Sequence, residues 1–310
     1  MNSSPHKVAF LGCGNMGSAI LLGLLDAFDE IKIGDDPTWN FTACTKTDQS
    51  AATLVEKLGR HAKQVQVLHE QNEKALAEAD VVILGVKPYL AKGVLSKPGI
   101  GQALAGKLVI SLMAGVSVDE VHGLILPAVK GSPSTATYVV KAIPTIAARY
   151  RQSMTLIERS SPPLPQHHEE LVTSIFNFVG SVKVLEPELM DVGSVLVTSC
   201  LATLTVPLDG LLDGSVIEGM PRRDAMELMS QGIAGLGVLL KHGGHPAMLR
   251  ESISSPRGVT IQTLLSVERE NTRVTFTDAL LRGTEHLQKM RSKAEARQSP
   301  EKDKTWEVFT

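Results

Sequence analysis

The feature that most constrains the fold is a glycine pattern near the start, Gly12-Cys-Gly-Asn-Met-Gly17, which fits G-x-G-x-x-G. It directly follows a short apolar run at residues 8–11 and opens a stretch typical of a helix at residues 16–28. A strand, a glycine turn and a helix in this order are the context in which the pattern binds a dinucleotide. The alternative is a glycine-rich turn that holds no ligand.

Each position of the motif has a physical reason. Gly12 permits the tight turn, Gly14 lets the backbone approach a pyrophosphate, and Gly17 permits close packing of helix on strand. Asn15 and Met16 lie at the helix start, where backbone N–H groups are free to face phosphates. The six residues together are therefore the first expected part of a cofactor site.

The first half of the chain alternates between strand-like and helix-like stretches. The strand-like runs are at residues 8–11, 41–45, 65–68, 81–84 and 108–112, with 138–143, 154–157 and 182–185 extending the series. Short apolar runs separated by helices predict a parallel sheet covered on both faces. The expected fold of residues 1–186 is thus an α/β Rossmann domain.

After about Pro187 the strand signals stop, and four or five helices are predicted instead. They are expected at residues 188–213, 222–241, 259–267 and 275–289, with a short one after Pro246. Residues 187–290 therefore form an expected all-α domain. Residues 291–310 are charged and nearly free of apolar side chains, which predicts a disordered tail.

Composition restricts the possible partners. The formal net charge of −2 does not favour nucleic acid, and an aromatic content of 4% is too low for a base-stacking platform. Three distant cysteines, Cys13, Cys44 and Cys200, indicate neither a disulfide framework nor a zinc site, and they suit a reducing compartment. We expect a cytoplasmic protein without a nucleic-acid partner.

One apolar stretch, residues 192–212, needs comparison with a membrane span. It contains several hydroxyl side chains, Pro207 and Asp209, and an aspartate is costly in lipid. We therefore interpret it as a helix buried in a core or a dimer interface. The histidine pairs His167-His168 and His242/His245 have no carboxylate or cysteine that completes a metal site, so no metal is expected.

The end of the second expected strand bears on the choice between NADH and NADPH. An NAD enzyme usually has an acidic residue there, whereas this chain has Thr45, Lys46 and Thr47, with Asp48 next. Lys46 can pair with a 2′-phosphate, and the two threonines can donate hydrogen bonds to it. NADPH is the expected cofactor. The alternative is that Lys46 is an ordinary solvated lysine in a turn.

Two further strand ends are candidates for cofactor contact, because ligands of open sheets collect at the carboxyl ends of strands. Val86, Lys87 and Pro88 follow the run at residues 81–84. Ala114 and Gly115 follow the run at residues 108–112 and would give the nicotinamide close access to the backbone. Lys87 has a simpler reading as a surface lysine before a helix-starting proline.

At this point the sequence resembles a known family, the pyrroline-5-carboxylate reductases. The similar segments run in order along nearly the whole chain: GCGNMGSAI within residues 8–25, ADVVILGVKP at residues 79–88, KLVISLMAGVSVDEV at residues 107–121, GMPRRDA at residues 219–225 and LRESISSPRGVTI at residues 249–261. The last of these is the most specific to the family, since a generic Rossmann protein would not supply it.

The resemblance implies an NADPH-dependent reduction of 1-pyrroline-5-carboxylate to L-proline, with the helical domain forming a homodimer or a higher homo-oligomer. It also implies that Ser255 and Thr260 contact the substrate. Backbone N–H groups around Gly258, Val259 and Thr260 would hold the substrate carboxylate, and the Thr260 hydroxyl would contact the ring nitrogen. A helix-capping role for these residues is compatible with that function.

The sequence also departs from the family pattern. The glycine-rich run of the family's long helix is replaced by residues 197–203, an asparagine is replaced by Thr145, and a glycine of the substrate loop is replaced by Arg257. Two alternatives therefore stay open beside the proline-forming activity. One is a reductase of a substituted cyclic imine in specialised metabolism, and the other is a catalytically weak NADPH-binding regulator.

Overall fold

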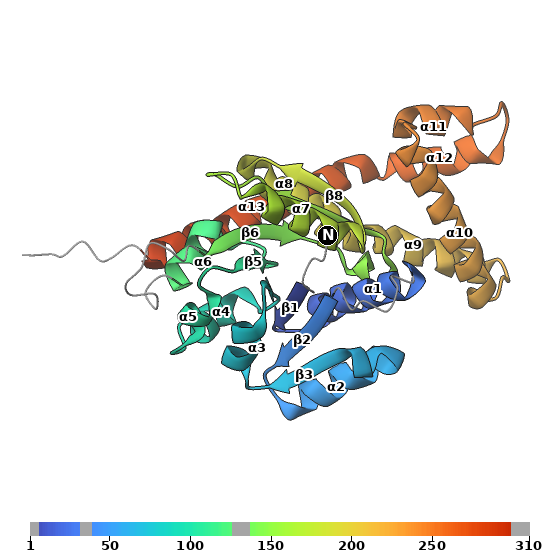
Figure 1. Ribbon diagram of the computed structural model, residues 1–310. Coiled ribbons are helices and arrows are strands. Elements are labelled where there is room, and N and C mark those ends of the chain that lie inside the picture. Colours follow the sequence, from blue (N-terminus) through green and yellow to red (C-terminus); the bar gives the residue numbers. More distant parts are fainter. Residues whose placement is uncertain (1–5, 32–38, 126–136, 299–310) are drawn as a thin grey trace, which may run out of the picture. The chain divides into compact units, whose positions relative to one another are not determined.

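The computed structural model describes residues 6–31, 39–125 and 137–298 (Figure 1). The chain divides into two compact units, which are described separately below. The first unit comprises Met1–Ser194 and His286–Thr310, and the second, the helical unit, comprises Val195–Glu285. The division thus falls later than the expected boundary at residue 187, and the described residues from His286 onward belong with the first unit.

The first unit contains an eight-stranded sheet with the order β3-β2-β1-β4-β5-β6-β7-β8. Strands β1 to β6 are parallel, β7 pairs antiparallel with β6, and β8 pairs parallel with β7. The strands are β1 (His6–Leu11), β2 (Trp39–Thr45), β3 (Val65–His69), β4 (Val81–Leu84), β5 (Leu108–Ser111), β6 (Tyr138–Ile143), β7 (Ser153–Glu158) and β8 (Gly180–Leu185). Every expected strand is confirmed, and the parallel β1–β6 series confirms the Rossmann fold.

Alternate residues of the central strands enter two separate cores, because successive side chains of a strand point to opposite faces. Phe10 and Ile83 belong to one core, whereas Leu11 and Leu84 belong to the other. The first core is completed by α1 (Asn15–Ile31), α2 (Asp48–Leu58) and α7 (Gln166–Asn177). The second is completed by α3 (Asn72–Glu78), α4 (Pro88–Leu95), α5 (Ile100–Leu104) and α6 (Val118–Ile125).

Helix α1 is tied to two short 3₁₀ segments, η1 (Gly59–Gln64) and η3 (Ile146–Tyr150), through one carboxylate. Asp26 accepts hydrogen bonds from Arg60 at 2.7 Å, from Arg149 at 2.5 Å and from the ring of His61 at 2.9 Å. Burial by itself would raise the pKa of Asp26, but the hydrogen bonds from His61, Arg149 and Arg60 outweigh it and lower that pKa to about 2.

The expected long helix from residue 188 is present, but it changes type along its length. It consists of η4 (Pro187–Leu189), α8 (Met190–Ser194), the π-helical segment η5 (Val195–Ser199) and α9 (Cys200–Ile217). The π-helical turn covers the start of residues 197–203, where the sequence lacks the family's glycines. A single π-helical turn inserts one extra residue into a helix and marks a local departure from ideal packing.

The remaining helices agree with the expected series. They are α10 (Arg222–Lys241), α11 (Pro246–Ser252), α12 (Val259–Arg269) and α13 (Thr272–Gln298). Helix α13 runs through residues 291–298, so the prediction of a disordered tail from residue 291 is wrong for these eight residues. The segment RSKAEARQ is rich in strong helix formers, which extend a helix without needing an apolar face. Residues 299–310 lie outside the described part.

The helical unit leaves much apolar surface uncovered within the chain. Of its described residues, only Val195, Leu212 and Ala225 are buried apolar side chains, while Val206 is 73% exposed. In the described part, one continuous helical stretch, Pro187–Ile217, is long and apolar enough to cross a membrane by length and composition alone. Exposure of so many apolar side chains to water is unfavourable, and contact with either lipid or protein would bury them.

Candidate functional site

The glycine turn has the geometry that dinucleotide binding requires. Gly12 has a φ of +88°, and a Cβ on it would lie 2.7 Å from a methyl carbon of Val86. Only glycine fits there, since both the left-handed conformation and the contact exclude a side chain. A Cβ on Gly14 would meet nothing within 4 Å, so the backbone at this position is open on the outside. The first-turn N–H groups of Asn15 and Met16 have no carbonyl partner inside α1.

Cys13 in the same turn is a packing residue. Its side chain is buried within the first core. Burial raises the pKa of its thiol to about 12, with the nearby Cys44 acting in the same direction and Lys57 acting against it. A thiol that stays protonated is a poor nucleophile, which favours the interpretation of Cys13 as a small buried filler.

The segment expected to bind the 2′-phosphate lies between β2 and α2. The Thr45 hydroxyl already donates to the Thr47 carbonyl at 3.4 Å, and the Thr47 side chain caps α2 by accepting from the Ser50 N–H at 3.2 Å. Lys46 is exposed between them. The turn is thus held by its two threonines, which leaves Lys46 as the group most available to an anion.

The structure adds a pair at this turn that sequence reasoning missed. The Nδ1 atom of His69, at the end of β3, lies 2.9 Å from a carboxylate oxygen of Asp48, the first residue of α2. Asp48 was the acidic residue closest to the expected 2′-phosphate position. The pairing of β2 with β3 brings His69 beside it, and no local sequence signal predicts that contact.

The end of β4 lies beside the glycine turn. Val86 packs against Gly12, and Lys87 is the N-cap of α4, with Pro88 in its first turn. The Lys87 ammonium lies 5.9 Å from the centre of the Tyr89 ring, so it points along α4. The expected helix-starting role of Pro88 is what the structure shows.

Ala114 and Gly115 follow β5, and Gly115 has a φ of +74°. A Cβ on Gly115 would lie 3.5 Å from Leu287 and 3.9 Å from Met290, both on the last turns of α13. Sequence reasoning assigned Gly115 to contact with the nicotinamide. The structure shows that this glycine also faces the C-terminal helix, which explains why residues 286–298 belong to the first unit.

The expected substrate loop lies in the helical unit, between α11 and α12. The Gly258 N–H donates to the Ser255 carbonyl at 2.9 Å, and a Cβ on Gly258 would lie 2.4 Å from the Ser255 hydroxyl oxygen. Gly258 is the N-cap of α12, and no side chain caps this helix. Arg257 adopts a left-handed φ of +60°, the conformation for which the family's glycine is suited.

The hydroxyl of Thr260 differs from those of its neighbours on α12. Thr263 and Ser266 donate to carbonyls four residues earlier, at 3.0 Å each. Thr260 lies in the first turn, where no such helical carbonyl exists, and no hydrogen bond of its hydroxyl is found in the described part of the chain. The side chain is half-buried and available to a ligand.

The structure therefore gathers the expected cofactor residues at one edge of the sheet. The turns after β1, β2, β4 and β5 all follow the carboxyl ends of parallel strands. Ser255, Gly258, Val259 and Thr260 come together separately, at the start of α12.

Thr145, at a departure from the family pattern, is buried at the end of β6. Its N–H donates to the Ser153 hydroxyl at 3.0 Å, and that hydroxyl lies 3.2 Å from the hydroxyl of Thr155. A threonine therefore fits this position by joining a buried row of hydroxyl groups.

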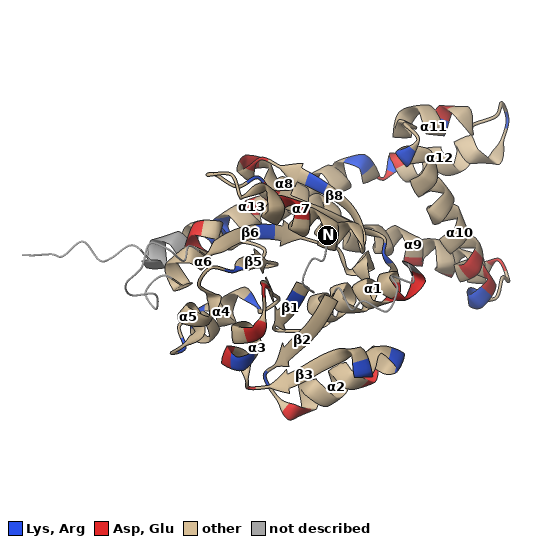
Figure 2. Cartoon of the chain, viewed as in Figure 1, with Lys and Arg blue, Asp and Glu red and all other residues tan. Residues whose placement is uncertain are grey.

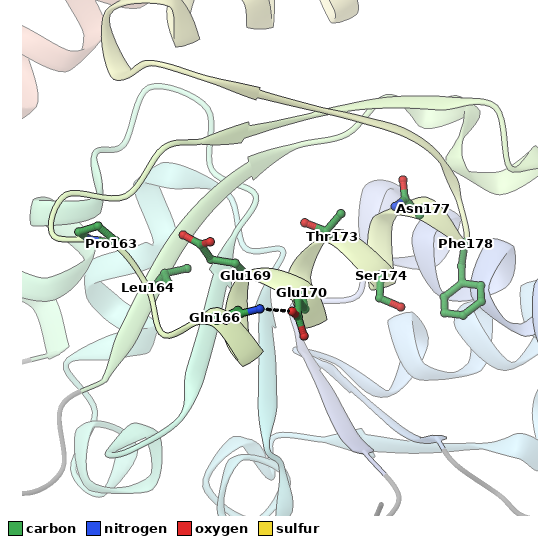
Figure 3. Close-up of a pocket in the computed structure, with 9 residues that line it drawn as sticks. All are labelled: Pro163, Leu164, Gln166, Glu169, Glu170, Thr173, Ser174, Asn177 and Phe178. Atoms are coloured by element: carbon green, nitrogen blue, oxygen red, sulfur yellow. Dashed lines mark hydrogen bonds between the residues drawn. The ribbon is translucent and has the colours of Figure 1, made fainter. Parts of the chain in front are cut away.

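An open groove of about 930 Å³ lies elsewhere in the first unit, along α7 (Figure 3). Glu169 and Glu170 are among the residues that line it, and the Gln166 side-chain amide donates a hydrogen bond to the Glu170 carboxylate at 2.8 Å. None of the expected cofactor or substrate residues lines it. The negative charges of the two glutamates would repel an anionic cofactor, so this groove is not the candidate site.

His242 and His245, two of the histidines considered for a metal site, lie at helix ends. His245 caps α11 by accepting from the Ala247 N–H, and His242 lies next to the end of α10 with Nδ1 3.0 Å from the Val238 carbonyl. Among the described residues, no group of three or more histidine, cysteine or acidic side chains is placed to hold a metal ion. Figure 2 shows basic and acidic residues interspersed along the chain.

Comparisons with known proteins agree with this architecture. A family model described as pyrroline-5-carboxylate reductase dimerisation matches residues 187–290, and one described as NADP oxidoreductase coenzyme F420-dependent matches residues 7–115. A crystal structure of the Plasmodium falciparum pyrroline carboxylate reductase with NADP bound has a TM-score of 0.74 and 23% identity, covering 92% of this chain and 98% of its own. That likeness shows the fold, a Rossmann domain followed by an all-α domain.

Curated relatives are similar over most of their length. A pyrroline-5-carboxylate reductase of Lophium arboricola is 35% identical over 295 residues, covering 91% of this chain and 92% of the relative. One of Neurospora crassa is 35% identical over 306 residues, with the same two coverages. The chain belongs to the pyrroline-5-carboxylate reductase family.

Proposed function

We propose that the chain reduces 1-pyrroline-5-carboxylate to L-proline with NADPH. The single observation that carries this conclusion is the substrate loop, in which Ser255, Gly258 and Thr260 keep the family's residues and leave the first turn of α12 uncapped by side chains. The named relatives are all reductases of this substrate, which favours it over a substituted imine and over a regulatory role without turnover.

The residues at the sheet edge fit NADPH. Gly12 makes the tight turn, Gly14 leaves the backbone open where a diphosphate would lie, and Lys46 offers a positive charge where a 2′-phosphate would lie. Val86, Lys87 and Pro88 after β4 and Ala114 with Gly115 after β5 form the remainder of the proposed cofactor-binding edge. Thr45 and Thr47 shape the Lys46 turn. When bound, NADPH supplies the hydride.

The proposed substrate contacts follow from the local geometry of α12. Backbone N–H groups of Val259 and Thr260 point out of a helix start, which favours a carboxylate. The Gly258 N–H is held by the Ser255 carbonyl, so Gly258 shapes the loop that presents them. The Ser255 hydroxyl lies against Gly258 and so contributes to the same loop. The Thr260 hydroxyl donates to or accepts from the ring nitrogen as it changes from iminium to amine.

A strong general acid is not required for this reaction. In a protonated imine the carbon of the C=N bond accepts the hydride, and the π electrons of that bond become the nitrogen lone pair. The protein therefore contributes mainly by holding the substrate in place and by stabilising the nitrogen. This accounts for a substrate loop that has no ionisable side chain besides Arg257.

We further propose that the active form is a homodimer or a larger homo-oligomer in the cytoplasm, without nucleic-acid or membrane partners. The apolar residues exposed on α9 and α10 are the surface that a second copy would cover, and the helical family model is one of dimerisation. The three cysteines are free, which suits a reducing compartment.

The first test is an assay of NADPH oxidation with 1-pyrroline-5-carboxylate, with L-proline measured as product. We expect one proline per NADPH consumed, and we expect methylated or six-membered imines to react more slowly. Tight NADPH binding without turnover of any imine would instead support a regulator. Turnover only with a substituted imine would overturn the proline-forming assignment.

A matched pair of variants tests the substrate loop. Thr260→Ala should lower kcat about tenfold, because it removes a hydrogen bond to the nitrogen that strengthens during the reaction. The NADPH dissociation constant should change less than twofold. Thr263→Ala, on the same helix, is the control and should leave both quantities unchanged. Equal losses of turnover and of NADPH affinity in Thr260→Ala would contradict the proposed role.

A further inference from the structure

We propose that Lys57, in the last turn of α2, is a further cofactor-binding residue whose ammonium group pairs with the diphosphate held at the start of α1. The inference rests on the proposed use of NADPH. It adds a residue that the glycine motif does not contain and that no sequence signal indicated, since Lys57 lies 42 residues from its contact in the motif.

The first observation is a contact. The Lys57 Nζ donates to the Asn15 Oδ1 at 3.5 Å. Asn15 is the first residue of α1 and lies between Gly14 and Gly17 of the glycine motif. The ammonium group therefore lies at the helix start whose free N–H groups would hold the diphosphate.

The second observation is that the charge of Lys57 reaches into the glycine turn. Lys57 acts to lower the pKa of the Cys13 thiol, against the larger effect of burial, which raises it. Cys13 lies between Gly12 and Gly14, so the electrostatic potential of Lys57 that acts on Cys13 also acts on an anion bound at the same turn. The field of Lys57 and that of the helix start have the same sign.

The third observation concerns the compensation of charge around α1. Arg60 and Arg149 are both bound to Asp26, and Arg151 is bound to Glu30. Among the ion pairs of the described residues, none includes Lys57. Its positive charge is therefore not paired with a carboxylate, unlike the charges of the neighbouring arginines. An anionic ligand would supply the missing negative charge.

A lysine in the last turn of a helix also has a simpler role, because it interacts favourably with the helix dipole. That role and cofactor binding are compatible, but they predict different results. A dipole interaction affects the stability of the protein without cofactor. A diphosphate contact affects the affinity for any cofactor that carries a diphosphate.

Lys57 and Lys46 should act on different phosphates. Lys46 lies in the turn between β2 and α2, which bears on the 2′-phosphate that NADPH alone has. Lys57 contacts the start of α1, which bears on the diphosphate that NADPH and NADH share. The two lysines can thus be separated by comparing the two cofactors.

The experiment measures the dissociation constants of NADPH and NADH by fluorescence titration of the full-length protein. We expect Lys57→Gln to raise both constants by a similar factor, about three- to tenfold, the range for loss of one partly exposed charge-assisted hydrogen bond. Lys46→Gln should raise mainly the constant for NADPH. Lys92→Gln removes a lysine from the last turn of α4 and is the matched control, which should change neither constant.

Lys57→Arg keeps the charge and should retain most of the affinity for both cofactors. The midpoint of thermal unfolding without cofactor shows whether each variant is folded. The proposal is overturned if Lys57→Gln leaves both constants unchanged, or if it weakens NADPH alone. If wild type reduces 1-pyrroline-5-carboxylate while Lys57→Gln binds both cofactors normally, the inference fails and the proposed function stands. If wild type binds NADPH but reduces no imine, the function fails while the Lys57 comparison can still be made.

Discussion

The two compact units of this chain bury their apolar residues to very different extents. In the first unit the strands and helices cover one another, and Phe10, Leu21 and Ile83 are completely buried. In the helical unit, α9 and α10 expose most of their apolar side chains, and Val206 is 73% exposed. The first unit thus covers its own core, whereas the second has apolar faces that its own helices do not cover.

The difference indicates where the stability of each unit comes from. Burial of apolar area is the main favourable term in folding, and a sheet with helices on both faces supplies it within the chain. A helical unit with exposed apolar faces gains the same term by association with another copy. The family's helical domain is one of dimerisation, which fits this account.

The largest expected effect is on the stability of the first unit. Phe10→Ala removes a fully buried ring between β1 and its neighbours and should cost about 3–5 kcal/mol of the free energy of unfolding. Urea denaturation followed by NADPH binding measures this, because that binding belongs to the first unit. The loss should not depend on protein concentration. A concentration-dependent loss would break the comparison between the units.

A smaller change should affect assembly rather than folding. Val206→Glu places a charge on the exposed apolar face of α9 and should convert the proposed dimer to a monomer, since an unpaired charge buried in an interface is strongly destabilising. Light scattering during size-exclusion chromatography measures the mass. NADPH binding should persist.

Val55→Glu is the matched control for assembly. Val55 is 43% exposed on α2, in the unit that is complete within one chain. The same substitution there should leave the mass unchanged. If both variants dissociate, or if neither does, exposure on the helical unit does not identify the interface.

The smallest expected effect is on the pH dependence of stability. The folded-state pKa of Asp26 is about 2, below the usual 3.8, so its hydrogen bonds stabilise the fold fully above about pH 4 and are lost as the pH falls toward 2. The difference in unfolding free energy between wild type and Asp26→Asn should therefore be constant above pH 4 and shrink below it. Urea titrations between pH 2 and pH 6 measure this.

Asp213, on α9 of the helical unit, provides the contrast. It pairs with Arg222 near the surface, with both side chains more than half exposed, and such pairs contribute little. Asp213→Asn should leave the pH profile of stability close to that of wild type. A profile as steep as that of Asp26→Asn would contradict the difference drawn between the two ion pairs.

Much of the fold follows from local patterns. Continuous apolar runs such as residues 81–84 predict buried strands, and the glycine turn predicts which helix follows β1. The helix boundaries are predicted less well, because several good helix formers after Met290 continue α13 to Gln298. Polar helix-forming residues resemble a disordered tail in composition, so composition alone did not distinguish the two.

The backbone turns of the candidate site follow from the sequence wherever adjacent residues set them. Gly12, Gly14 and Gly258 belong to this group, since turns and helix starts are set by adjacent residues. The contacts of Lys57 with Asn15, of His69 with Asp48 and of Gly115 with α13 were not predicted. Each joins residues that are far apart in sequence.

The sequence by itself determined the alternation of strands and helices, the glycine turn after β1 and the loop before α12, because each depends on the conformational preferences of neighbouring residues. Only the tertiary structure decided which charges around α1 are compensated. It also decided that the second half of α13 packs against Gly115, and that the helical unit does not cover the apolar faces of its own α9 and α10. The physical reason is that Coulomb interactions and burial depend on distance in space, which sequence separation does not report.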